Sequence, residues 1–243
     1  LGKFTGDQIT VYNDQYKEMI TSIKFANDDV VSSIGMSRAD SCFHAKEKKK
    51  KHILFFLIRP KTGLVESKIN FSWDSIAEDT LNSTLSFAEK NPDLRFIFKI
   101  KIIDERETYK QQKMIKDKNL KNCYMVYGGN SHQLILNSKF IITFNSTAIF
   151  EGLASKKKIL IPFFKKKYEK YLKEFIIDTS GSKNIFHAED TNHLKNLLQD
   201  LSYNEEKLEY IESVRDNELL KINIGNSDGK SSERLTKVIE NLI

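Results

Sequence analysis

Several patterns that mark large enzyme classes are missing from this 243-residue sequence. No GxGxxG follows the first buried run, where Arg59-Pro60-Lys61 stands instead, and this argues against a nicotinamide or flavin dinucleotide fold. The lack of GxxxxGK[ST] argues against a P-loop nucleotidase, and the lack of GxSxG argues against a hydrolase nucleophile elbow. The five histidines form no HExxH or other metal pair, so no metal is expected.

Cysteines and long apolar runs are also scarce. The two cysteines, Cys42 and Cys123, fit no metal-ligand or CxxC spacing, so we expect reduced thiols in a cytoplasmic protein. No apolar run approaches the ~20 residues needed to span a bilayer, and no signal peptide is evident. The chain starts at Leu1 without a methionine, so we expect a fragment or a trimmed chain, and whether an upstream domain precedes it stays open.

The formal net charge of +6 comes from lysine, which is clustered at 48–51, 156–158 and 165–167. Such runs are most often solvated turns. An anionic ligand or an anionic membrane surface is the functional alternative, the latter implying peripheral contact at the inner face of the membrane. No RNA-binding motif with interleaved aromatics accompanies the lysines, so we expect no nucleic-acid partner.

From residue 52 onward, apolar strand-like runs alternate with helical patterns. The predicted strands are His52–Ile58, Leu94–Ile103, Cys123–Tyr127, Lys139–Phe144, Ile159–Phe164 and Asn184–Phe186, with a further short one at Phe175–Ile177. The main predicted helices are Trp73–Lys90, Asp104–Asn119, Ser131–Asn137, Asp190–Leu201, Glu205–Leu220 and Ser231–Ile243. This alternation predicts an α/β, Rossmann-like, doubly wound and mostly parallel sheet. A charged stretch near 44–51 suggests a boundary between an interdomain segment, 1–48, and the main domain, 49–243.

The stretch Lys139–Phe164 predicts a strand–helix–strand unit with chemistry at its first turn. Asn145, Ser146 and Thr147 open the helix at the carboxyl end of a strand, where unpaired amides, the helix dipole and two hydroxyls suit a phosphate. Glu151 lies one turn further on the same face and is placed to accept hydrogen bonds from sugar hydroxyls. The alternative is a simple capped helix with a solvated glutamate.

Lysines occupy the far end of the strand Leu94–Ile103. Lys99 and Lys101 alternate with apolar residues there, so both are candidates to reach an anion bound at the sheet edge. A solvated strand end explains the same pattern.

Several blocks together resemble the nucleotide-binding C-terminal half of GT-B glycosyltransferases. They are the Gly35–Asp40 turn (GMSRAD), the Asn145–Glu151 block (NSTAIFE) and the Ser227–Arg234 ending (SDGKSSER). The order is most similar to the bacterial surface-polysaccharide group, with CDP-glycerol glycerophosphotransferases and capsule Kdo transferases. The resemblance covers about residues 30–243 and implies donor-phosphate contacts by Ser146 and Thr147.

In that group the downstream Glu contacts the nucleotide sugar, a role that maps to Glu151. The group usually carries Lys-x-His-Pro after the strand with Lys99, but here Lys101 and Ile102 replace the His and Pro. We therefore assign charge stabilisation of the leaving phosphate to Lys99 or Lys101. No DxD triplet is present, so neither a metal nor a cofactor is expected.

The expected function is transfer of a sugar or polyol phosphate from a nucleotide-linked donor in surface polysaccharide synthesis. The resemblance implies a nucleotide-sugar donor and a glycan or lipid-linked glycan acceptor as partners. Two alternatives stay open: a sugar-nucleotide epimerase of similar fold, and a module that binds a nucleotide or glycan without chemistry.

Overall fold

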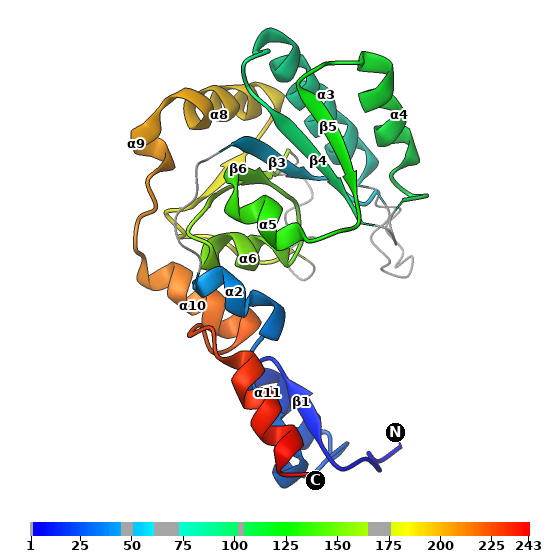
Figure 1. Ribbon diagram of the computed structural model, residues 1–243, viewed down its shortest axis with the longest axis vertical. Helices are drawn as coiled ribbons and strands as arrows, with labels where there is room; N and C mark the ends of the chain where they lie inside the picture. Colours follow the sequence, from blue (N-terminus) through cyan, green and yellow to red (C-terminus); the bar gives the residue numbers. More distant parts are fainter. Residues whose placement is uncertain (1, 45–50, 61–72, 102–104, 165–175) are drawn as a thin grey trace.

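The computed structural model describes residues 2–44, 51–60, 73–101, 105–164 and 176–243. Figure 1 shows a sheet domain at the top and a smaller lobe below it that holds both ends of the chain. Within the described residues, no helix is long and apolar enough to cross a membrane.

A six-stranded parallel sheet forms the centre of the larger domain, with strand order β5-β4-β3-β6-β7-β8. The strands are β3 (His52–Phe56), β4 (Phe96–Ile100), β5 (Cys123–Tyr127), β6 (Ser138–Ile142), β7 (Lys158–Pro162) and β8 (Ile185–Ala188). In the register, Phe55 lies between Phe98 of β4 and Ile142 of β6. Because all six strands run the same way, their carboxyl ends meet at one edge of the sheet.

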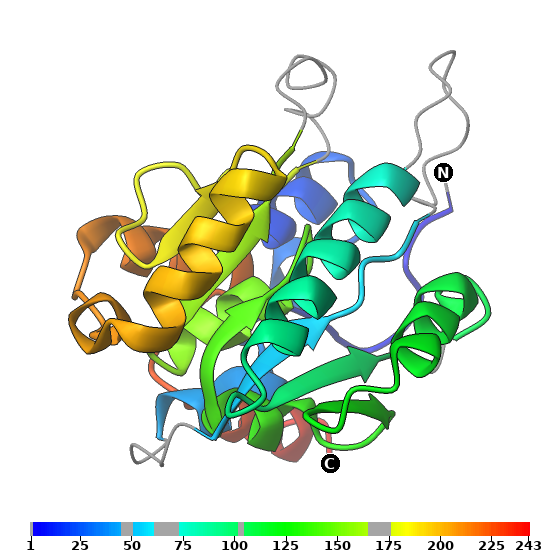
Figure 2. The ribbon, with the colours of Figure 1, turned by 90° about the horizontal axis from the view of Figure 1, so that it is seen from above.

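Helices cover both faces of this sheet, as Figures 1 and 2 show. One face carries α3 (Asp74–Lys90), α4 (Tyr109–Lys118) and α8 (Thr191–Tyr203), and the other carries α5 (Ser131–Leu136), α6 (Ala148–Ala154) and α10 (Val214–Ile224). Strand alternation explains the two layers: Ile53 and Phe55 share a core with α3 and α8, whereas Leu54 and Phe56 pack with Ile135 of α5. The predicted doubly wound, Rossmann-like fold is confirmed.

The lower lobe is a small β-α-β unit joined by the last helix. It consists of β1 (Ile9–Val11), α1 (Asp14–Ser22), β2 (Val31–Ser33) and α11 (Ser231–Glu240), with β1 parallel to β2. Strand β1 was not predicted, because three residues are too short to give a hydrophobic period.

Two blocks far apart in the sequence meet where the lobe joins the sheet domain. Gly35 has a φ of +89°, and a Cβ there would lie 2.3 Å from Ser231 Oγ, so the crossing requires glycine. Asp40 accepts hydrogen bonds from the backbone amides of Ser231 (3.0 Å) and Ser232 (2.6 Å). This carboxylate therefore caps α11 from 191 residues away and ties the lobe to the segment 35–40.

Some predicted boundaries differ from the structure. The single helix predicted at Glu205–Leu220 is two helices, α9 (Glu205–Leu208) and α10, because the side chain of Asn184 binds the backbone N–H and C=O of Ile211 between them. In the strand predicted at Phe175–Ile177, the last two residues are not in a strand, and Phe175 lies outside the described residues. The proposed domain boundary at residue 48 also lies outside them and stays a prediction.

Candidate functional site

The turn from β6 into α6 is built by three consecutive polar residues. Asn145 has a φ of +43°, a left-handed conformation that asparagine tolerates better than most residues. Its Oδ1 accepts a hydrogen bond from the amide of Ile177 at 3.2 Å. Ser146 Oγ accepts one from the amide of Ala148 at 3.3 Å, and the amides of Ile149 and Phe150 donate to the carbonyls of Ser146 and Thr147 at 3.0 Å. The first amides of α6 are therefore paired, and the prediction of unpaired amides at this helix start was wrong.

An arginine from outside the predicted site joins Thr147 to Glu151. Arg38 Nη2 donates to Thr147 Oγ1 at 2.6 Å and lies 3.3 Å from Glu151 Oε1. The arginine belongs to the 3₁₀ turn η2 (Ser37–Ala39), at the junction with the lobe. Thr147 and Glu151 therefore do lie on one face of α6, as predicted, and a cation covers that face.

Two effects shift the pKa of Glu151 in opposite directions. Burial raises the pKa of this carboxyl, since its side chain is 13% exposed, while the nearby charges of Arg38 and Lys101 lower it. Burial prevails, and the net shift is upward. A half-desolvated carboxylate with two cations near it is suited to accept hydrogen bonds from ligand hydroxyls.

The two candidate lysines of β4 have different surroundings. Lys99 is 3% exposed, and its Nζ donates to the carbonyl oxygen of Ile100 at 3.2 Å. Burial lowers the pKa of Lys99, and the charge of Lys101 lowers it further. Lys101 is exposed just beyond β4 and acts electrostatically on Glu151, so it stands closer to the predicted chemistry than Lys99.

A pocket of about 800 Å³ opens at the carboxyl ends of β7 and β8. Its lining is apolar at Ile149, Ile161, Phe163, Ile176 and Ile177, and polar at Asn145, Asp178, Thr179, Ser180, Ser182 and His187, with Gly181 between. Glu151 lies two positions after Ile149, which puts their side chains about 160° apart around α6. The pocket and the Arg38 contact thus flank the start of α6, with Asn145 between them.

The polar side of this pocket is internally bonded. Thr179 Oγ1 lies 2.8 Å from His187 Nε2, and Asp178 accepts a hydrogen bond from the amide of Ser180 at 3.0 Å. The hydrogen bonds from Ser180 lower the pKa of Asp178, whereas burial lowers the pKa of His187. An ionised carboxylate and a hydroxyl therefore face a cavity with an apolar wall, which suits a ligand that has both hydroxyls and a hydrophobic side.

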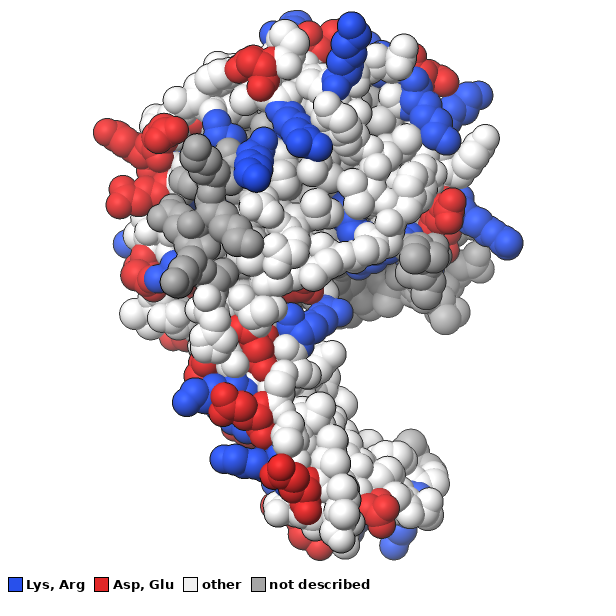
Figure 3. All heavy atoms as spheres, in the orientation of Figure 1, with Lys and Arg blue, Asp and Glu red and all other residues white. Residues whose placement is uncertain are grey.

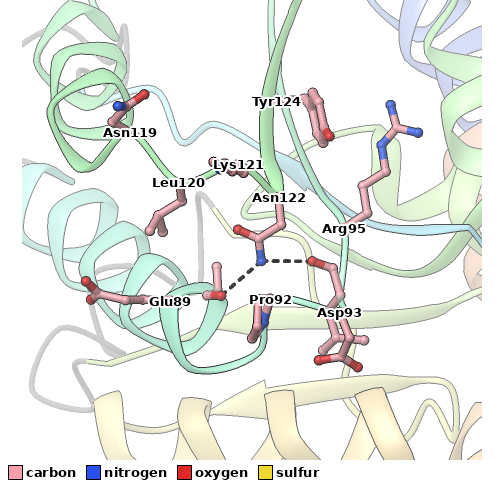
Figure 4. A pocket seen from close by; sticks show the side chains of 11 residues that line it. Glu89, Pro92, Asp93, Arg95, Asn119, Leu120, Lys121, Asn122 and Tyr124 are labelled. Carbon is pink, nitrogen blue, oxygen red and sulfur yellow. Dashed lines mark hydrogen bonds between the residues drawn. The ribbon is translucent and has the colours of Figure 1, made fainter.

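A second hollow, of about 460 Å³, lies at the opposite edge of the sheet (Figure 4). Its central residue is Asn122, whose amide donates to the carbonyls of Ala88, Asn91 and Leu94. These bonds hold the loops that enter β4 and β5. Ligands of open α/β sheets bind at the carboxyl edge, so we place the candidate site at α6 and not here.

The described Lys and Arg side chains on the face shown in Figure 3 lie among neutral and acidic side chains. In the run 156–158, Lys157 and Lys158 are 6% and 2% exposed, and Lys158 Nζ donates to Asn184 Oδ1 at 2.7 Å. Only Lys156 of this run reaches the surface, where it pairs with Glu212 at 2.7 Å. The run is therefore not the exposed cluster that the sequence suggested; run 165–167 and most of 48–51 lie outside the described residues.

In the part of the chain that the structure describes, no group of three or more His, Cys, Asp or Glu side chains is placed to hold a metal ion. The structure brings together Asn145, Ser146, Thr147 and Glu151, with Lys101 near the last of these. Sequence reasoning missed Arg38 as a site residue, although its turn was part of the family resemblance. It also missed the pocket beside Asn145, whose lining is spread over four segments.

No protein-family model and no curated protein matches the sequence. Solved structures do match its fold. The UDP-GlcNAc 2-epimerase of Methanocaldococcus jannaschii, solved with UDP-GlcNAc and UDP, has a TM-score of 0.53 at 13% identity, over 97% of this chain and 61% of that one. MnaA of S. aureus, solved with UDP, has a TM-score of 0.54 at 14% identity, over 98% and 61%.

The wall teichoic acid polymerase TagF is similar to the same degree, with a TM-score of 0.54 at 17% identity, over 97% of this chain and 57% of its own. These proteins are GT-B-type enzymes, so the resemblance to the GT-B fold is confirmed at the level of fold. This chain spans about three fifths of the length of the structures it matches.

Proposed function

We propose that this chain is the donor-binding half of a GT-B glycosyltransferase. It would transfer a sugar or polyol phosphate from a nucleotide-linked donor during surface polysaccharide synthesis. The observation that carries the proposal is the pairing, at the start of α6, of the Thr147–Glu151 face with an 800 Å³ pocket on the other flank. Both lie at the sheet edge where this fold class binds ligands.

The two flanks suit the two parts of such a donor. Glu151 accepts the ribose hydroxyls, and the hydroxyls of Ser146 and Thr147 receive the phosphate. The transferred group extends past Asn145 toward the pocket, where Asp178 and Thr179 offer partners for hydroxyls. Lys101, and Lys99 behind it, stabilise the charge that develops on the departing nucleotide. The residues fit a mechanism in which cations of the chain meet this charge.

The test is binding and turnover with nucleotide-linked sugars. We expect CMP-, CDP- or UDP-sugars to raise the melting temperature, and the double variant Ser146→Ala plus Thr147→Ala to lose most of that increase. Glu212→Gln, at an exposed ion pair remote from α6, is the matched control. An unchanged increase in the double variant would show that the phosphate binds elsewhere.

Turnover separates the alternatives. Transfer to a glycan or lipid-linked acceptor supports the transferase. Inversion at a sugar carbon without an acceptor supports an epimerase, an alternative that the similarity to the solved UDP-GlcNAc 2-epimerase favours. Binding without either reaction, in a protein that includes any upstream domain, supports a non-catalytic module. Salt-sensitive retention of RNA that nucleotides do not displace would contradict all three.

A further inference from the structure

Arg38 differs from an ordinary surface arginine because the turn that carries it is buried and hydrogen-bonded on both sides of the residue. Its neighbours Met36 and Ala39 are 3% and 0% exposed and belong to the main core. The backbone amide of Met36 donates to the carbonyl of Ile224 at 2.9 Å, and that of Ala39 donates to Met36 at 2.8 Å. A rigid turn thus holds a side chain that is itself 54% exposed.

The contacts of this guanidinium use only part of its hydrogen-bonding capacity. Nη2 contacts Thr147 and Glu151, and Nε lies 3.4 Å from the sulfur of Met36. Of the five N–H groups of an arginine, the two on Nη1 have no partner among the residues that the structure describes. The arginine of this ion pair is 54% exposed, which limits what the pair adds to stability, although the Glu151 side chain that it neutralises is only 13% exposed.

The position of Arg38 fits a phosphate. It contacts the Thr147 hydroxyl that the proposed function gives to the donor phosphate, and a guanidinium binds phosphate oxygens through paired N–H groups. The carboxylate of Glu151 lies 3.3 Å from the same guanidinium. A phosphate carries more charge than one carboxylate and would draw the guanidinium toward itself, which frees Glu151 to accept hydroxyls.

We propose that Arg38 binds the donor phosphate and that the phosphate replaces Glu151 as the partner of this guanidinium. The proposal rests on the proposed function for the identity of the donor. It assigns an anion-binding role to a residue 109 positions before Thr147, in the turn that also carries the α11 cap Asp40.

The experiment measures dissociation constants of the full chain for UDP, CDP, uridine, cytidine and inorganic pyrophosphate. We expect Arg38→Ala to weaken the diphosphates that bind by about 10- to 100-fold, as loss of a charged hydrogen bond does, and to change nucleoside binding less than about twofold. Arg38→Lys should fall between, because lysine keeps the charge but not the paired donors. Arg95→Ala is the control, since Arg95 stacks on Tyr124 (4.4 Å) at the opposite edge of the sheet.

A purely structural role predicts a different pattern. Equal losses for nucleosides and diphosphates in Arg38→Ala, or no loss for either, would overturn the proposal. A second readout is the pH profile: because Arg38 lowers the pKa of Glu151, its removal should move the acid limb of nucleotide binding to higher pH. An acid limb at the wild-type pH would also count against the proposal.

Failure of the inference and failure of the function give different results. Wild-type protein that binds pyrophosphate through Arg38 but binds no nucleotide would refute the donor and keep the anion site. Nucleotide binding that is indifferent to Arg38 would refute the anion site and keep the donor. Absence of binding to both pyrophosphate and nucleotides would refute both.

Discussion

Glu151→Gln should separate stability from binding in this protein. The change keeps the shape of the side chain and removes its charge. In the wild type, burial raises the pKa of Glu151 despite the opposing charges of Arg38 and Lys101, so the fold tolerates this carboxylate rather than gains from it. We therefore expect Glu151→Gln to leave the free energy of unfolding unchanged or slightly higher at neutral pH.

The magnitude follows from exposure. The ion pair with Arg38 spans 3.3 Å, but the arginine side chain is 54% exposed, so its loss costs at most about 1 kcal/mol. Relief of the desolvated charge offsets that cost. The net change in unfolding free energy should stay within about 1 kcal/mol, on the stabilising side. Urea unfolding without ligand measures it, with Glu212→Gln, at an ion pair exposed on both sides, as the control.

Binding should respond in the opposite direction. A hydrogen bond from a ribose hydroxyl to an ionised carboxylate contributes roughly 1.5–3 kcal/mol, so Glu151→Gln should weaken nucleotide binding by about 10- to 100-fold. Nucleotides that lack the ribose 2′-hydroxyl or 3′-hydroxyl should bind the wild type more weakly than the parent nucleotide does. The same change of ligand should weaken binding to the variant much less. Calorimetric titration of the four combinations gives the coupling between carboxylate and hydroxyl.

Two results would refute this reasoning. If the loss from the deoxy ligand is the same in both proteins, Glu151 does not contact the ribose. If Glu151→Gln loses several kcal/mol of stability, the carboxylate is a structural ion pair. The pH dependence gives a further check: as pH falls through the raised pKa of Glu151, the wild type should gain stability relative to the variant and lose nucleotide affinity.

Three further predictions concern the supports of the site. His52 is 4% exposed, and burial lowers its pKa to about 4. The free energy of unfolding should therefore be highest above about pH 6.5 and fall by about 2 kcal/mol as the pH drops toward 4, after allowance for solvent screening. Urea titrations of His52→Gln should lack this pH dependence. Asp40→Ala should cost about 1 kcal/mol through loss of the α11 cap, with partial recovery in Asp40→Asn, measured by urea midpoints. Asn145→Ala should cost about 1–2 kcal/mol because alanine resists the left-handed φ, whereas Asn145→Gly should cost less and keep nucleotide binding; equal losses would show that the side chain, not the backbone, matters.

The sequence predicted the strands best where consecutive residues of a strand are all buried. Strand β3 is buried at all five positions, and an apolar run without polar breaks predicts such a strand directly. Strand β5 is partly exposed, yet the aromatic and β-branched run Cys123–Tyr127 also marks its bounds. These short runs with helical patterns between them were sufficient to predict the parallel sheet and its carboxyl edge.

Tertiary contacts decided what the sequence did not show. The side chain of Asn184 binds the main chain of Ile211 in the break between α9 and α10. The lysine run 156–158 looked like a surface feature by composition. Its position at the start of β7 instead buries Lys158 against Asn184. In each case a partner more than twenty positions away sets the outcome, and no pattern within one segment contains it.

Arg38 shows the same limit at the functional site. Thr147 and Glu151 were predictable together because a helix places residues four apart on one face, but the cation that covers this face comes from 109 positions earlier. Lys101, which the resemblance placed where the GT-B group usually has a histidine, acts with Arg38 on the charge of Glu151. Under the proposed function these two cations meet the donor phosphate. Glu151, whose pKa burial raises, is then the group whose protonation limits binding as the pH falls.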